Sequence, residues 1–568
     1  MAPDWLKMNR DKLGGWGNSL YHSPADKKLL KDKKRLQAMV KVMVSDRLAD
    51  KPHLYSEMEQ ANALMRKIRL FLHMYLSLTT DLRSDMEVEA LSILNDLNTE
   101  RTQLQALSIW SVSNSTDAPA KWKSSQRRQG VSVMPWRAAV SYSEQAQFAF
   151  DHHWVSQYRY DKSIHDMARR YGGLAQLGAG LRNRDREIRI AAADQMGEWL
   201  KEVGSKGEDL FRAHARLAKK KRFNFAAIDA SEKTLEIARR VALERAPQLT
   251  EKYLKSKAVQ SKASGELIFW HDRYAGIDDS RETKAWRDTK QDVLRNLSSL
   301  GEEVNKAARR LVESNNLIQP RGRGGGFTTP VLYGRKGKVE AGPFVYAPFD
   351  GSAESERTLA HELGHAVHAY LSAPSGAMQS DAGWAVAETI ALLFEHVNLS
   401  DDNNGISDQD FAMLVHQPAI AMFERELGIA TQDMSADAVW IHALRAHYGP
   451  DISLKGYAPF WRRHSSSLSA PGYPMAYLLG WALAGYAAKR IESASDKMQR
   501  PMLRILKAGG NIGYDEAASL LGIRNISELI HGAFDRALDR LGSQSAYALP
   551  SIETDPDFNM EKLESRGR

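Results

Sequence analysis

Apolar residues recur at helical spacing along most of this chain of 568 residues, and this spacing constrains the fold more than any other feature. It runs through 24–101, through 142–300 and from about 350 to 541, and it is clearest at 183–203 and 230–258. The first of these stretches also lacks the alternation of β-branched residues that indicates strands. The sequence therefore predicts a mainly α-helical protein.

One segment, residues 320–348, departs from this pattern. It begins with a loop rich in glycine and arginine and continues to GPFVYAP at 342–348, which predicts a short strand with a proline near each end. Because proline cannot donate a hydrogen bond to a neighbouring strand, we expect the strand from Phe344 to Ala347 to lie at the edge of a small sheet. Such an edge could pair with the main chain of a peptide, although a plain structural hairpin fits these residues nearly as well.

A polar break divides the chain into predicted regions. The stretch SVSNSTDAPAKWKSSQRRQG at 111–130 is rich in residues that resist packing into a core. It predicts an N-terminal helical region at 1–130 and a second domain at 131–545. A polar C-terminal tail is expected at 546–568.

The chain contains no cysteine, which excludes disulfides, thiolate catalysis, iron–sulfur clusters and cysteine-based zinc sites. Any metal must therefore be held by His, Asp or Glu. The apolar runs are too short to span a bilayer, and the first residues lack the core of a signal peptide, so we expect a soluble, cytoplasmic protein without a membrane partner. The basic excess, 78 Lys and Arg against 70 Asp and Glu, is dispersed, so we expect no nucleic-acid partner.

The most informative short motif is H-E-L-G-H at 361–365. On a helix, His361 and His365 lie on one face about one turn apart, where both imidazoles could bind one ion. Glu362 lies to the side of that face and could take a proton from a water molecule without binding the metal. The motif predicts hydrolysis of an amide bond, with Glu362 as the general base.

A catalytic zinc site takes three protein ligands and keeps one position for water, so a third ligand is needed. Glu388 lies in the segment 381–397, whose apolar residues predict a second helix. We therefore predict one Zn²⁺ per chain, held by His361, His365 and Glu388. Glu395, two turns later, could hydrogen-bond a ligating imidazole. Without the motif upstream, both glutamates would be interpreted as solvated residues of an ordinary helix.

Two stretches, TLAHELGHAVH at 358–368 and VAETIALLFE at 386–395, resemble the thimet oligopeptidase and oligoendopeptidase F family of zinc peptidases. Glu388 matches the third metal ligand of that family, and weaker similarity extends over about 142–540. The resemblance implies a mainly α, large helical ellipsoid with a deep central channel and a small β-sheet near the zinc site. It also implies that 131–545 is the catalytic domain and that the substrates are short peptides, cleaved at internal bonds. The oligomeric state stays open.

The resemblance further implies a cluster of His and Tyr that binds the substrate carbonyl, located at WRRHSSSLSAPGYPMAYLLG, 461–480. Tyr473 and Tyr477 match its tyrosines, although both could instead pack in the core with satisfied hydroxyls. The histidine position of the family holds Ser466, and His464 lies two residues earlier. Either the loop is rearranged so that His464 serves, which we favour, or the chain lacks that donor.

Two other functions remain open. A zinc carboxypeptidase of similar helical fold would use the same ligands but would need a cation placed for the C-terminal carboxylate of its substrate. A catalytically weakened peptide-binding protein would keep the fold and could explain the displaced histidine. Turnover and the length of the products would separate these functions.

Overall fold

The computed structural model describes most of the chain between residues 21 and 542. The described residues are 21–107 with short gaps, 120, 174–202, parts of 208–215, 228–260, 268–275 and 283–542 with short gaps. The predicted boundary near residue 130 and the predicted tail at 546–568 lie outside them.

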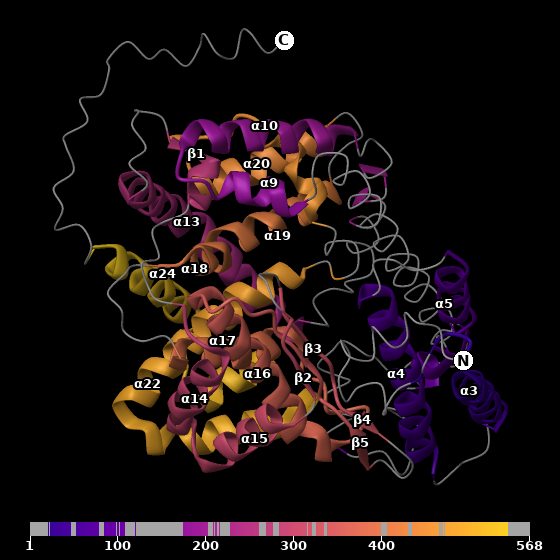
Figure 1. Ribbon diagram of the computed structural model, residues 1–568. Helices are drawn as coiled ribbons and strands as arrows, with labels where there is room; N and C mark the ends of the chain where they lie inside the picture. The colour runs from indigo at the N-terminus through magenta and orange to yellow at the C-terminus, as the bar shows by residue number, and fades with distance from the viewer. Residues whose placement is uncertain are drawn as a thin grey trace, which may run out of the picture.

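Helices build most of the described chain, as the apolar spacing of the sequence predicted. The largest group packs around one extended apolar core, and at its centre α17 (Trp384–Asn398) packs against both α16 (Ala353–Ser372) and α22 (Tyr473–Ala508). In Figure 1, α14 and α15 lie near these helices, whereas α9, α10 and α20 lie at the opposite end of the molecule. The surrounding helices are α9 (Leu174–Leu181), α10 (Arg186–Glu202), α13 (Glu232–Gln260), α14 (Trp286–Asn296), α15 (Glu302–Glu313), α18 (Asp408–Phe411), α19 (Gln417–Leu427), α20 (Ala436–Tyr448), α23 (Tyr514–Leu520) and α24 (Ile526–Gly542).

Three N-terminal helices form a second, smaller core. They are α3 (Lys27–Asp46), α4 (Leu54–Leu78) and α5 (Ser84–Asp96), within the range where long helices were predicted. Their buried apolar side chains pack with Leu332 and Phe344 from the strand region. Figure 1 shows these helices in indigo on one side of strands β2 to β5, with α16 on the other side.

The strands in the described part of the chain are short and form three small sheets. β2 (Leu317–Ile318), β6 (Val345–Tyr346) and β3 (Phe327–Thr328) form a sheet in that order, with β6 parallel to β2 and antiparallel to β3. The other sheets each have two strands. They pair β4 (Leu332–Tyr333) with β5 (Val339–Ala341), and β1 (Ile268–Phe269) with β7 (Ile452–Ser453).

The prediction that the strand from Phe344 to Ala347 lies at a sheet edge is wrong, because β6 is the central strand. The amides of Val345 and Ala347 donate hydrogen bonds to main-chain carbonyls on the β2 side, and the carbonyl of Phe344 accepts one from Thr329 on the β3 side. The two prolines lie outside these hydrogen-bonded positions, so they remove no bond from the ladder. Among the described strands, β3 is therefore an edge of this sheet.

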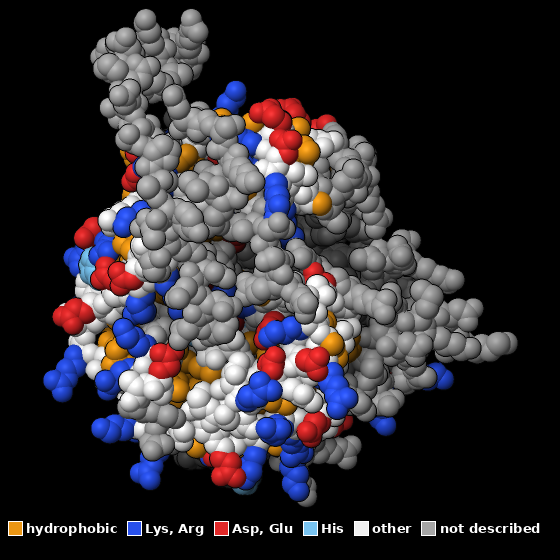
Figure 2. All heavy atoms as spheres, turned by 60° about the vertical axis from the view of Figure 1, so that its left-hand side comes forward, with side chains coloured by type: hydrophobic (Ala, Val, Ile, Leu, Met, Phe, Trp, Pro, Cys, Tyr) orange, Lys and Arg blue, Asp and Glu red, His pale blue; other side chains and the backbone are white. Residues whose placement is uncertain are grey.

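Charged side chains of both signs are dispersed over the face of the molecule that Figure 2 shows. On the face shown in Figure 2, Lys and Arg side chains lie interspersed with Asp and Glu, and apolar side chains are scattered among them. Within the described stretches, no helix combines the length and the apolar character that a bilayer span requires.

Candidate metal centre

Helix α16 carries the H-E-L-G-H motif and begins at a well-formed cap. Ser352 is the N-cap, and its side chain accepts a hydrogen bond from the amide of Ser355. Asp350 precedes the cap and accepts a hydrogen bond from the amide of Ser352. Glu354 and Glu356 lie in the first turn, where their charge favours the helix dipole.

Two glycines allow three helices to approach closely around Glu388. A Cβ atom at Gly364 of α16 would lie 2.8 Å from the Cα of Ala391 on α17. A Cβ atom at Gly480 of α22 would lie 3.0 Å from the Cβ of Glu388. Real Cβ atoms do not approach other atoms to 2.8 Å, so α16 and α17 can pack at this distance only because residue 364 has no side chain. The close packing brings the motif and Glu388 together.

His361, His365 and Glu388 form one compact group, the predicted metal ligands. One potential ligand atom from each residue lies within 4.8 Å of the others. The Nε2 atoms of the two histidines are 3.2 Å apart, and each is 3.6 Å from an oxygen of Glu388. Three atoms at these separations can converge on a single ion. The spacing expected from the sequence is therefore present in three dimensions.

Glu395 fixes the orientation of the His361 ring. Its Oε1 lies 2.5 Å from Nδ1 of His361, so the Nδ1 hydrogen is donated to this carboxylate and Nε2 is left facing His365 and Glu388. Gln409 donates a hydrogen bond of 3.1 Å to the same oxygen, and Arg357 lies 3.7 Å from the other. The outer position suggested for Glu395 thus agrees with its contacts. Gln409 and Arg357 were not anticipated.

Burial and charge shift the pKa values of this group strongly. Burial by itself would lower the pKa of His361, but the hydrogen bond and the charge of Glu395 raise it to about 9. Burial lowers the pKa of His365 well below its usual range, and the adjacent charge of His361 adds to this effect. Burial raises the pKa of Glu388 and raises that of Glu362 to about 7. Buried groups that compete for protons in this way are expected at a metal site, because a bound cation takes the place of the protons.

The residues present fit a divalent cation. Glu388 is 2% exposed, yet its Oε2 has no hydrogen-bond partner among the described residues. This orphaned oxygen lies 3.6 Å from Nε2 of His361 without a hydrogen bond to it, so a cation bound by the imidazole nitrogens could also satisfy the carboxylate. Two imidazoles and one carboxylate form a donor set found in catalytic zinc sites.

Glu362 lies beside these ligands and is held by strand β3. Its side chain is 6% exposed, and its Oε2 accepts a hydrogen bond of 2.7 Å from the Thr328 hydroxyl. Gly326 packs against the same carboxylate so closely that a Cβ atom there would lie 2.5 Å from Cγ of Glu362. The glycine-rich composition of 320–326 is visible in the sequence, but it did not predict that this loop contacts Glu362.

The two tyrosines of the predicted His and Tyr cluster lie at the metal group. The hydroxyl of Tyr473 donates a hydrogen bond to Oε1 of Glu388, and the hydroxyls of Tyr473 and Tyr477 are 3.4 Å apart. Burial and the charge of Glu388 raise the pKa of both phenols, so both remain protonated donors. Trp384, one turn before Glu388, packs edge-on against Tyr473.

The structure places His464 in a different set of rings. Its imidazole lies against His416 and Trp440, with ring centres 5.4 and 5.1 Å away, and burial lowers its pKa to about 3. Within the described chain, none of its ring contacts reaches the metal ligands or the two tyrosines. Ser466 lies outside the described residues, so the role suggested for His464 stays a prediction.

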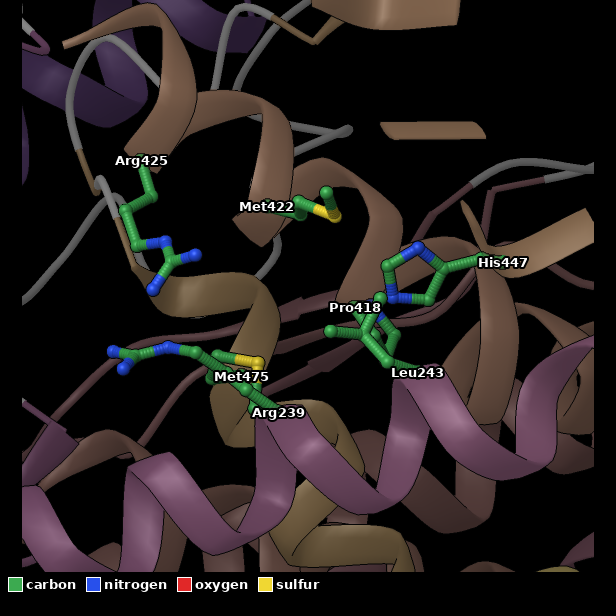
Figure 3. A pocket seen from close by; sticks show the side chains of 7 residues that line it. All are labelled: Arg239, Leu243, Pro418, Met422, Arg425, His447 and Met475. Carbon is green, nitrogen blue, oxygen red and sulfur yellow. The ribbon is translucent and has the colours of Figure 1, made fainter. Parts of the chain in front are cut away.

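A small cavity lies between α13, α19, α20 and the first turn of α22 (Figure 3). Its volume of about 20 Å³ holds a water molecule but no peptide. Arg239, Arg425 and His447 line it together with apolar side chains.

Comparisons with known proteins support the fold. PZ peptidase A, solved with an inhibitor, superposes with a TM-score of 0.71 at 15% identity, over 90% of this chain and 97% of that chain. Oligoendopeptidase F from Enterococcus faecium superposes with a TM-score of 0.56 at 14% identity, over 91% of this chain and 96% of that chain. No family model and no curated protein matches the sequence. The chain has the mainly helical fold of these two proteins, as the resemblance implied.

Proposed function

We propose that this chain is a zinc-dependent oligopeptidase that hydrolyses internal bonds of short peptides. The observation that carries the proposal is the convergence of His361, His365 and Glu388 to within 4.8 Å, with Glu362 beside them. These three residues would hold the ion. The fold shared with PZ peptidase A and oligoendopeptidase F adds support, because both carry peptidase names.

When bound, the ion would polarise the scissile carbonyl and lower the pKa of water. Glu362 would accept a proton from the attacking water and later pass it to the leaving amine. Glu395 would keep the His361 ring oriented throughout, because its carboxylate binds the Nδ1 hydrogen. The burial of Glu362 and Glu388 would exclude bulk water and so strengthen these interactions.

Tyr473 and Tyr477 would stabilise the charge that develops on the substrate oxygen. The hydroxyl of Tyr473 lies next to Glu388, that of Tyr477 lies next to Tyr473, and both stay protonated, so each keeps one hydrogen to donate. Donors already in place where negative charge develops are a large source of catalysis.

Strand β3 supports a peptide as the substrate. It has β6 as its hydrogen-bonded neighbour on one side and contacts Glu362 through Thr328. An extended peptide that adds to such an edge would place its main chain beside the general base. The pairing with a peptide main chain that was expected of the Phe344 to Ala347 strand is thus proposed for β3. The deep channel, and with it the limit to short peptides, stays part of this proposal.

The test is mass spectrometry of the products from a mixed pool of short peptides. We expect internal cleavage by the zinc-loaded protein, loss of cleavage with a chelator, and loss of most cleavage with full metal content in Glu362→Gln. Release of single C-terminal residues would instead identify a carboxypeptidase. Saturable peptide binding without products would identify a peptide-binding protein and would refute the proposal.

A further inference from the structure

We propose that Thr328 orients the general base, holding one carboxylate oxygen of Glu362 so that the other is free to accept the proton. This role rests on the proposed peptidase function. Thr328 touches neither the metal ligands nor the reacting atoms, so it is a positioning residue that acts through Glu362.

The hydroxyl of Thr328 lies between two acceptors on the same residue. Its Oγ1 is 2.7 Å from Oε2 of Glu362 and 2.8 Å from the main-chain oxygen of Glu362. A hydroxyl has one hydrogen, and both distances are those of good hydrogen bonds. One threonine thus contacts both the helix backbone and the carboxylate, which limits rotation of the glutamate side chain between them.

The two oxygens of the Glu362 carboxylate are therefore not equivalent. Oε2 is bound by Thr328, and no other described residue donates a hydrogen bond to Oε1. With Oε2 occupied, Oε1 is the oxygen available to a water molecule. Fixing a general base in its reactive orientation lowers the entropy cost of proton transfer.

Gly326, two residues before Thr328, also restricts this carboxylate. A Cβ atom at residue 326 would lie 2.5 Å from Cγ and 2.9 Å from Oε1 of Glu362. The main chain of residue 326 thus packs closely against the glutamate side chain, and any side chain at 326 would displace the carboxylate.

The position of Thr328 is fixed by the sheet. Thr328 pairs with Val345 in the antiparallel ladder between β3 and β6. The next residue, Thr329, donates its amide hydrogen to the carbonyl of Phe344. The hydroxyl therefore reaches Glu362 from a strand anchored outside α16.

The test compares Thr328→Val, which removes the hydroxyl at nearly constant shape, with Thr328→Ser, which keeps it. We expect kcat to fall about 10- to 100-fold in Thr328→Val, with KM and metal content little changed, and to recover to within about threefold in Thr328→Ser. The control is Thr358→Val, which removes another hydroxyl from the face of α16 without touching Glu362 and should keep kcat within about twofold of the parent.

A wild-type kcat in Thr328→Val would overturn the positioning role. An equal loss in the Ser variant would also overturn it, because the hydroxyl would then not be the cause. If Thr328→Val does not fold, Gly326→Ala supplies the second measurement, with the same fall in kcat expected and wild-type kcat again contradicting the proposal. Failure of the peptidase function itself is distinguishable, since the unmodified protein would then not cleave peptides at all.

Discussion

Two buried clusters of charged residues in this molecule differ in whether the carboxylate at their centre has hydrogen-bond partners for both of its oxygens. The arginine–aspartate cluster joins Arg186 and Arg189 of α10 to Asp272, and the metal group joins His361 and His365 to Glu388. Asp272 and Arg189 are fully buried, and Glu388 is 2% exposed. Depth therefore does not distinguish a structural cluster from a site that binds a ligand.

The carboxylate of Asp272 is satisfied by the protein alone. Arg189 binds one of its oxygens at 2.7 Å, and Arg186 binds the other at 2.8 Å. The amide of Phe269 donates a further bond of 2.9 Å. Burial would raise the pKa of Asp272, but the hydrogen bonds from the two arginines outweigh it and lower the pKa. The carboxylate of Asp272 therefore needs no added cation.

In the metal group, by contrast, one oxygen of the central carboxylate has no hydrogen-bond partner in the described part of the chain. Oε2 of Glu388 has no hydrogen-bond partner among the described residues, and two imidazole nitrogens point toward the same space. The contrast favours a ligand-binding role for the metal group, where the orphaned oxygen lies beside two imidazoles, and a structural role for the arginine–aspartate cluster. The predictions below separate these two roles.

The largest effect is expected from Glu388→Ala. Zinc binding worth roughly 10–16 kcal/mol is shared among three or four ligands, so losing one should weaken metal affinity by about 10²- to 10³-fold or more and remove turnover. Elemental analysis and a chelator competition would measure the loss. Glu354→Ala, an exposed glutamate of the same motif helix, is the control and should keep its metal. One ion per chain in Glu388→Ala would show that the third ligand lies elsewhere.

Asp272→Ala should act on stability and leave metal binding intact. Removing the carboxylate leaves two arginines in or near the core without their ion-pair partner. Breaking a buried pair in this way lowers the free energy of unfolding by about 3–5 kcal/mol. Denaturant unfolding would measure the cost, and zinc titration of the folded variant should match that of the parent. The control is Glu198→Ala, which breaks an exposed pair with Lys201 and should change stability by less than about 1 kcal/mol. Weakened zinc affinity in Asp272→Ala would contradict the purely structural role of the arginine–aspartate cluster.

Glu395→Gln should have an intermediate effect on the metal group. An amide can still accept the Nδ1 hydrogen of His361, but it lacks the negative charge that favours the ligating ring. Such outer contacts typically contribute 10- to 100-fold in metal affinity. Zinc titration followed by competition with a chelator would test this, and unchanged affinity would reduce Glu395 to a packing residue.

The local parts of the metal group could be predicted from the sequence, and the long-range parts could not. The spacing of His361 and His365 and the helix that carries Glu388 depend on residues close together in the chain. The edge position of β3 and the contact of Thr328 with Glu362 depend on how separate segments pair, and two-residue strands are too short to show a period. His464 shows the same limit, because its surroundings, His416 and Trp440, come from other helices.

The smallest effect is expected on the free energy of unfolding at acidic pH, which a buried neutral histidine such as His447 should lower. His447 is 2% exposed, donates its Nδ1 hydrogen to the carbonyl of Ala443 and shares its cavity with Arg239 and Arg425 (Figure 3). Burial lowers its pKa from 6.5 to about 4, although the hydrogen bond opposes the shift. Between these values the unfolded chain binds a proton that the folded chain does not.

The free energy of unfolding should therefore fall as the pH drops from about 6.5 to about 4, by up to about 1.4 kcal/mol per pH unit from His447. His447→Asn keeps a donor for the Ala443 carbonyl but cannot titrate, so its unfolding free energy should depend less steeply on pH by that amount. Denaturant unfolding at several pH values would measure both slopes. Equal slopes would mean that His447 is protonated alike in the folded and unfolded chains. The metal group cannot produce this difference, because it is the same in both proteins.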